Sequence, residues 1–136
     1  MSDRSIKKAA SEAAAKQVAK GLPAPSVSEE MGVHISAASM SCWINSELHG
    51  FHDPGPDGRV STHAERLMLI VSECSEALEE LRKPEYDAAA FGSELADIVI
   101  RTFDLAVSAD VDIGQAIQDK HAKNIKRPFR HGGKRL

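Results

Sequence analysis

The stretch from Asp87 to Ala109 constrains the fold most, because it is apolar around almost its whole helical circumference. Its main apolar stripe recurs every three or four residues and consists of Phe91, Leu95, Ile98, Thr102 and Leu105. This spacing predicts an α-helix, and a helix that is apolar on nearly every side must be covered by its neighbours. We therefore expect this helix to lie at the centre of the fold.

Three other segments show helical periodicity and helix-start signals. Ser26 with Glu29, and Thr62 with Glu65, fit capping boxes, and Asp112 can cap a helix that runs to about Lys126. The expected core stripes are Val33, Ala37, Met40, Ile44 and Leu48 in the first segment, and Leu67, Ile70, Val71, Cys74, Ala77, Leu78 and Leu81 in the second. No stretch shows a strand pattern of similar quality.

The sequence therefore predicts an all-α fold, a four-helix bundle assembled as a homo-oligomer. Residues 1–25 are expected to form an N-terminal helical or disordered extension with a linker, and residues 26–136 the helical domain. A dimer or tetramer is expected because Val99, Ile100 and Phe103 point away from the main stripe of their helix, and soluble monomers avoid large exposed apolar patches. Aromatic residues make up only 4% of the chain, which also favours association.

The composition indicates in which cellular compartment the protein works and what kinds of partner it binds. The two cysteines, Cys42 and Cys74, form no CxxC pair, and no apolar run is long enough for a membrane span, so a cytoplasmic protein is expected. Residues 64–119 carry 13 acidic and 4 basic side chains, whereas residues 120–136 carry 7 basic and no acidic ones. This contrast indicates either a basic tail that binds nucleic acid, or an acidic metal site with basic groups for phosphate.

Two pairs of acidic residues carry the functional signal. Glu73 and Glu76 are three residues apart, as are Glu94 and Asp97, so each pair projects two carboxylates from one helical face. Such pairs are common as surface charge. Glu79 and Glu80 are also interpreted as surface charge, although Glu80, one heptad after Glu73, is the one of the two that could face the site. Two pairs on adjacent apolar helices are different, because a divalent cation between them would offset the cost of burying the charges. A site whose ligands are all oxygen atoms is suited to Mg²⁺ or Mn²⁺.

With these motifs the sequence resembles the MazG-like, all-α nucleoside triphosphate pyrophosphohydrolases, whose signature is ExxE followed by ExxD. Here Glu73-x-x-Glu76 is followed after 17 residues by Glu94-x-x-Asp97. The resemblance covers about residues 30–134 and includes Lys120, Asn124, Arg127-Pro128 and His131-Gly132.

The resemblance implies an enzyme that hydrolyses nucleoside triphosphates between the α and β phosphates. It implies Mg²⁺ ligation by Glu73, Glu76, Glu94 and Asp97, and a homodimer or homotetramer. A carboxylate that is not fully used in ligation can accept the proton of the attacking water, and Glu76 is our candidate.

Other side chains are assigned by position. Lys120, Asn124 and Arg127 share one helical face and can grip phosphate and sugar oxygens, although a solvated basic helix end has the same pattern. Trp43 either stacks on the base or belongs to the core. Arg101 is a candidate ion-pair partner of Asp97 or Asp104. The histidines have no metal-ligand spacing and are interpreted as structural or surface residues.

Two rival functions remain open from the sequence. One is hydrolysis of another nucleotide such as phosphoribosyl-ATP. The other is a non-catalytic helical module that binds nucleic acid through residues 120–135. Nucleic acid is the less favoured partner, because Phe129 is the only aromatic in that segment and the four carboxylates would have no role.

Overall fold

The computed structural model describes residues 8, 11–13, 15–16, 19–21 and 26–127, and the predicted linker at 22–25 lies outside them. The helices described along their whole length are α2 (Glu29–Leu48), α3 (His63–Arg82), α4 (Ala88–Ser108) and α5 (Ile113–Ile125). The described residues contain no strand, which confirms the all-α prediction for this part of the chain. None of its helices is both long and apolar enough to cross a membrane.

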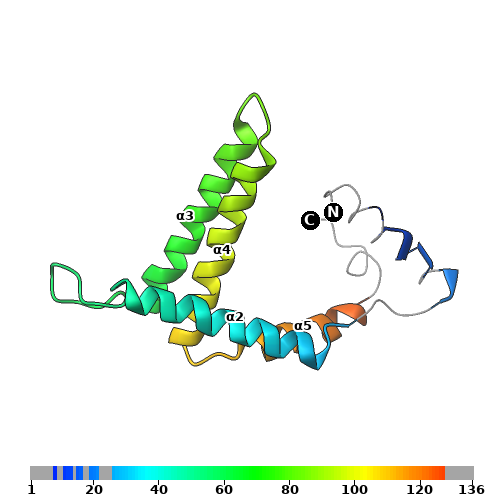
Figure 1. Ribbon diagram of the computed structural model, residues 1–136, viewed down its shortest axis with the longest axis horizontal. Helices are drawn as coiled ribbons and strands as arrows, with labels where there is room; N and C mark the ends of the chain where they lie inside the picture. The colour runs from blue at the N-terminus through cyan, green and yellow to red at the C-terminus, as the bar shows by residue number, and fades with distance from the viewer. Residues whose placement is uncertain (1–7, 9–10, 14, 17–18, 22–25, 128–136) are drawn as a thin grey trace. The chain divides into compact units, whose positions relative to one another are not determined.

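The chain divides into two compact units. One comprises residues 29–116 and holds α2, α3 and α4; the other comprises 1–28 together with 117–136. Within the first unit α3 and α4 lie side by side as a hairpin, and α2 packs on α4 at the end where α3 begins and α4 ends (Figure 1). α4 thus contacts both of the other helices, in line with its apolar circumference.

The helix boundaries follow from local capping. The Thr62 hydroxyl accepts a hydrogen bond from the Glu65 amide at 3.2 Å, and the Glu65 carboxylate accepts one from the Thr62 amide at 2.7 Å, so the predicted capping box is present. Asp87 caps α4 by accepting from the amides of Ala89 and Ala90. The Asp112 carboxylate accepts from the Gln115 amide at 3.0 Å at the start of α5.

The start of α2 differs from the prediction. The helix begins at Glu29, so Ser28 directly precedes it and Ser26 is too far upstream to cap it. After the end of α2, Gly50 adopts a φ of +73°, and the Phe51 amide donates to the Ser46 carbonyl at 3.0 Å.

The first turn of α5 lies against α2 at two glycines. A Cβ on Gly114 would collide with the Gly32 carbonyl oxygen and with the Ser36 hydroxyl. The Ser36 hydroxyl also donates to the Asp112 carboxylate at 2.7 Å. This close approach requires the absence of a side chain at Gly114.

The apolar stripes are not buried within one chain, which corrects the sequence-based core. Among the described residues, the buried apolar side chains are Ala77 and Ala106. The exposed ones include Val33, Met40, Ile44 and Leu48 on α2, Leu67, Val71, Leu78 and Leu81 on α3, and Leu95, Val99 and Ile100 on α4. The reason is geometric: among the described helices α3 packs on α4 alone, and one neighbour covers only a narrow strip of a helix.

Candidate functional site

Three of the four predicted carboxylates meet between α3 and α4. Oxygen atoms of Glu73 and Glu76, from α3, and of Glu94, from α4, all lie within 4.8 Å of one another. The i, i+3 spacing puts the two α3 residues on one face, and the packing of the hairpin turns that face toward Glu94. The Glu73 side chain is only 9% exposed, so the cluster extends from the helix interface to the surface.

The charges in this cluster act on one another. Desolvation raises the pKa of Glu94, and the carboxylates of Glu76, Asp97, Glu73 and Glu80 raise it further. Like charges at such short range disfavour ionisation. A divalent cation would remove this repulsion, and a set of carboxylate oxygens is the donor set that Mg²⁺ or Mn²⁺ prefers.

Asp97 does not belong to the group that lies within 4.8 Å. It lies one turn after Glu94 on α4 and lines a cavity of about 380 Å³. The other lining residues are Asn45, Ser46, Phe51, Ser61, Arg66, Leu69, Ile100, Arg101 and Asp104. The structure thus divides the predicted tetrad into a carboxylate cluster and one aspartate on the cavity wall.

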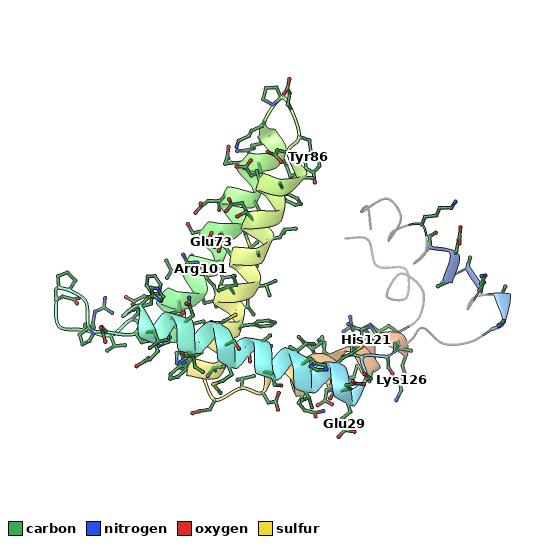
Figure 2. The ribbon with its side chains drawn as sticks, in the orientation of Figure 1. Glu29, Glu73, Tyr86, Arg101, His121 and Lys126 are labelled. Carbon is green, nitrogen blue, oxygen red and sulfur yellow. The ribbon has the colours of Figure 1, made fainter. Side chains whose placement is uncertain are left out.

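Arg101 connects the cluster to the cavity. Its Nε donates to Glu73 Oε1 at 2.6 Å, and the two labelled side chains lie close together in Figure 2. Arg101 also lines the cavity. The expected partners of Arg101, Asp97 and Asp104, are both on its own helix. The prediction of that pairing is wrong, because the guanidinium instead reaches across the hairpin to the more deeply buried carboxylate.

A polar network at the foot of the hairpin was not predicted. His52 places Nδ1 2.7 Å from Glu47 Oε2 and Nε2 2.8 Å from Asp104 Oδ1, and its side chain is 12% exposed. Arg66 donates to the Ser108 hydroxyl at 2.7 Å. Sequence reasoning had no signal for His52, because it lies in a turn-rich loop whose position depends on the helices around it.

Trp43 belongs to this network rather than to the cavity wall. Its Nε1 donates to the Ser108 hydroxyl at 3.2 Å, and its ring centroid lies 5.4 Å from that of His52. It is absent from the cavity-lining residues. Its contacts fit the structural interpretation of this side chain.

The predicted phosphate-binding residues lie in the other unit. Lys120 and Asn124 are exposed on α5. α5 ends at Ile125, so Arg127 follows the helix and does not continue its face, which corrects the expected shared face. His131 lies outside the described residues.

Comparison with known proteins found no family model, no curated protein and no solved structure that matches the chain. A functional assignment therefore depends on the residues themselves and on the geometry of the cluster and cavity.

Proposed function

We propose that the chain is a magnesium-dependent nucleoside triphosphate pyrophosphohydrolase that produces a nucleoside monophosphate and pyrophosphate. The observation that carries the proposal is the meeting of Glu73, Glu76 and Glu94 beside a cavity that Asp97 lines. The ExxE and ExxD spacing supports it, because in this spacing the sequence resembles the MazG-like enzymes.

The protein residues would divide the work as follows. Glu73, Glu76 and Glu94 hold the cation, with Asp97 available from the adjacent turn. The bound cation supplies neutralisation of phosphate charge. Glu76 is the exposed member of the cluster and accepts the proton of the attacking water. The water oxygen forms a bond to the α phosphorus. The bond between the α phosphorus and the oxygen that bridges it to the β phosphorus breaks, and pyrophosphate leaves with the electron pair of that bond.

The cavity is suited to the rest of a nucleotide. It offers an aromatic ring from Phe51, apolar side chains from Leu69 and Ile100, and polar groups from Asn45 and Ser46. The remaining lining residues are polar or charged, which suits the sugar and phosphate groups of a nucleotide.

The test is pyrophosphate release from a panel of dNTPs, NTPs and phosphoribosyl-ATP, with and without Mg²⁺. Glu73→Gln, Glu76→Gln, Glu94→Gln and Asp97→Asn are each expected to lose most of the turnover. Glu79→Gln is the matched control, because Glu79 lies on the same helix but pairs with Arg82 at the surface. Wild-type rates in two or more of the four variants would refute the assignment.

We further propose that the chain functions as a homodimer or homotetramer. Leu67, Leu78 and Val99 are each about half exposed, at 55%, 49% and 47%. Apolar surface on this scale usually marks an interface, and an isologous contact would bury the same patch on both copies. Light scattering at micromolar concentration tests this, with Val99→Asp as the disrupting variant. A fully active species of 14.7 kDa would contradict the proposal.

A further inference from the structure

The cavity wall carries two guanidinium groups among carboxylates. Arg66 and Arg101 are its cationic residues, and Asp97 and Asp104 are its anionic ones. The aspartates repel a ligand that carries several negative charges, and a cationic side chain on the wall that contacts the ligand would offset this repulsion. Both arginines line the cavity, but they differ in how free they are to contact such a ligand.

Arg66 is already engaged. Its Nη1 donates to the Ser108 hydroxyl at 2.7 Å and lies 3.7 Å from Asp104 Oδ2, and its side chain is only 11% exposed. A ligand would have to displace these contacts in a nearly buried setting. Arg66 is therefore best explained as a structural cation that neutralises Asp104.

Arg101 is differently placed. Its side chain is 43% exposed, and among the residues that the structure describes its guanidinium has one partner, Glu73, which it contacts through Nε. A guanidinium has five N–H donors in a planar fork, so the four N–H groups of the two terminal nitrogens remain uncommitted. This fork matches the oxygens of a phosphate group, which can accept two parallel hydrogen bonds.

We propose that Arg101 is the phosphate-binding residue of this cavity, holding Glu73 through Nε while its terminal nitrogens donate to oxygens of the triphosphate. This inference rests on the proposed function for its ligand class. It assigns the phosphate contact to the unit that carries the carboxylates, in place of Lys120, Asn124 and Arg127 of the other unit. One side chain then links the cation-binding carboxylates to the phosphate chain.

The experiment separates phosphate binding from mere support of Glu73. The probe is a nucleoside triphosphate with a non-hydrolysable α,β-methylene bridge, titrated by calorimetry in the presence of Mg²⁺ against the full-length chain. Arg101→Gln is expected to weaken binding about tenfold, because a charge-assisted hydrogen bond is lost. Arg101→Lys should retain part of the affinity, since it keeps the charge without the fork. Arg82→Gln, which removes an exposed arginine paired with Glu79, should bind as the wild type does.

A second measurement is Mn²⁺ affinity of the nucleotide-free protein, followed by electron paramagnetic resonance. Removing a positive charge beside the cluster should leave this affinity unchanged or increase it. A loss of Mn²⁺ affinity as large as the loss of nucleotide affinity would show that Arg101 only positions Glu73, and would overturn the proposal. Unchanged nucleotide affinity in Arg101→Gln, or no binding of the probe by the wild type, would also overturn it. If the wild type binds the probe through Arg101 but releases no pyrophosphate from substrates, the proposed reaction fails and the Arg101 assignment stands.

Discussion

His52 Nε2 lies 2.8 Å from Asp104 Oδ1 and thereby ties the loop between α2 and α3 to the last turns of α4. The other ring nitrogen lies 2.7 Å from Glu47 Oε2 on α2. Ionised carboxylates only accept hydrogen bonds, so the imidazole ring donates to both carboxylates when each of its nitrogens carries a proton. A single loop side chain thus joins two helices.

Replacing His52 with alanine should therefore reduce the free energy of unfolding by about 1–3 kcal/mol, because it leaves the nearly buried Asp104 without this donor. The midpoint of urea unfolding measures the change. His34→Ala is the control, since His34 is exposed and lies 3.9 Å from Glu30, and it should cost less than about 0.5 kcal/mol. Equal losses in the two variants would show that the network contributes nothing specific.

Glu94→Gln should leave the metal-free protein as stable as the wild type or more stable. Desolvation and then the neighbouring carboxylates raise the pKa of Glu94, so the folded state binds its proton more tightly than the unfolded state does. Stability consequently decreases as the pH rises from the unfolded-state value through the raised one, and at neutral pH the ionised group opposes folding. The neutral amide removes that opposition.

Addition of Mg²⁺ should stabilise the wild type more than it stabilises Glu94→Gln. It should raise the melting temperature of the wild type, because a ligand that binds only the folded state stabilises it, and should raise that of Glu94→Gln much less. Differential scanning fluorimetry with and without EDTA measures both. An equal shift in both proteins would place the cation elsewhere.

The Thr62–Glu65 capping box should make stability depend on pH in the acid range. Hydrogen bonds from the Thr62 amide and hydroxyl, and then from Arg59, lower the pKa of Glu65 from 4.5 to about 2. The stabilisation is present above the unfolded pKa of 4.5 and is lost as the pH falls toward 2. Glu65→Gln should flatten this part of the profile relative to the wild type, as followed by circular dichroism. Identical acid profiles would contradict the assignment.

Gly114→Ala should destabilise the protein by about 1–3 kcal/mol, because its methyl group meets the Gly32 carbonyl oxygen and the first turn of α5 must move away from α2. Gly92→Ala is the matched control, since Gly92 lies within α4 and a Cβ there meets nothing within 4 Å. That variant should gain roughly 0.5–1 kcal/mol from the better helix propensity of alanine. The free energy of unfolding of both variants, measured with a chemical denaturant, tests this contact, and an equal or higher stability of Gly114→Ala would contradict it.

Local features of this chain were predictable from the sequence. The caps formed by Thr62 and Asp112 involve residues within three positions of one another, so the residue types indicate the hydrogen bonds, although the same pattern at Ser26 and Glu29 does not cap α2. That Glu73 and Glu76 share one face of their helix was also predictable, since helical geometry places residues i and i+3 on the same side.

The tertiary structure decided which side chains meet across helices. Arg101 pairs with Glu73, 28 positions away, and His52 reaches Asp104, 52 positions away. These partners depend on how each helix is rotated and on where α2 crosses the hairpin. Hydrophobic periodicity predicts which face of a helix is apolar, but it does not predict the axial position of that helix relative to its neighbour. The same limit explains why Asp97 lines the cavity while Glu94 joins the cluster. The apolar stripes predicted as core are exposed because α3 packs on α4 alone among the described helices.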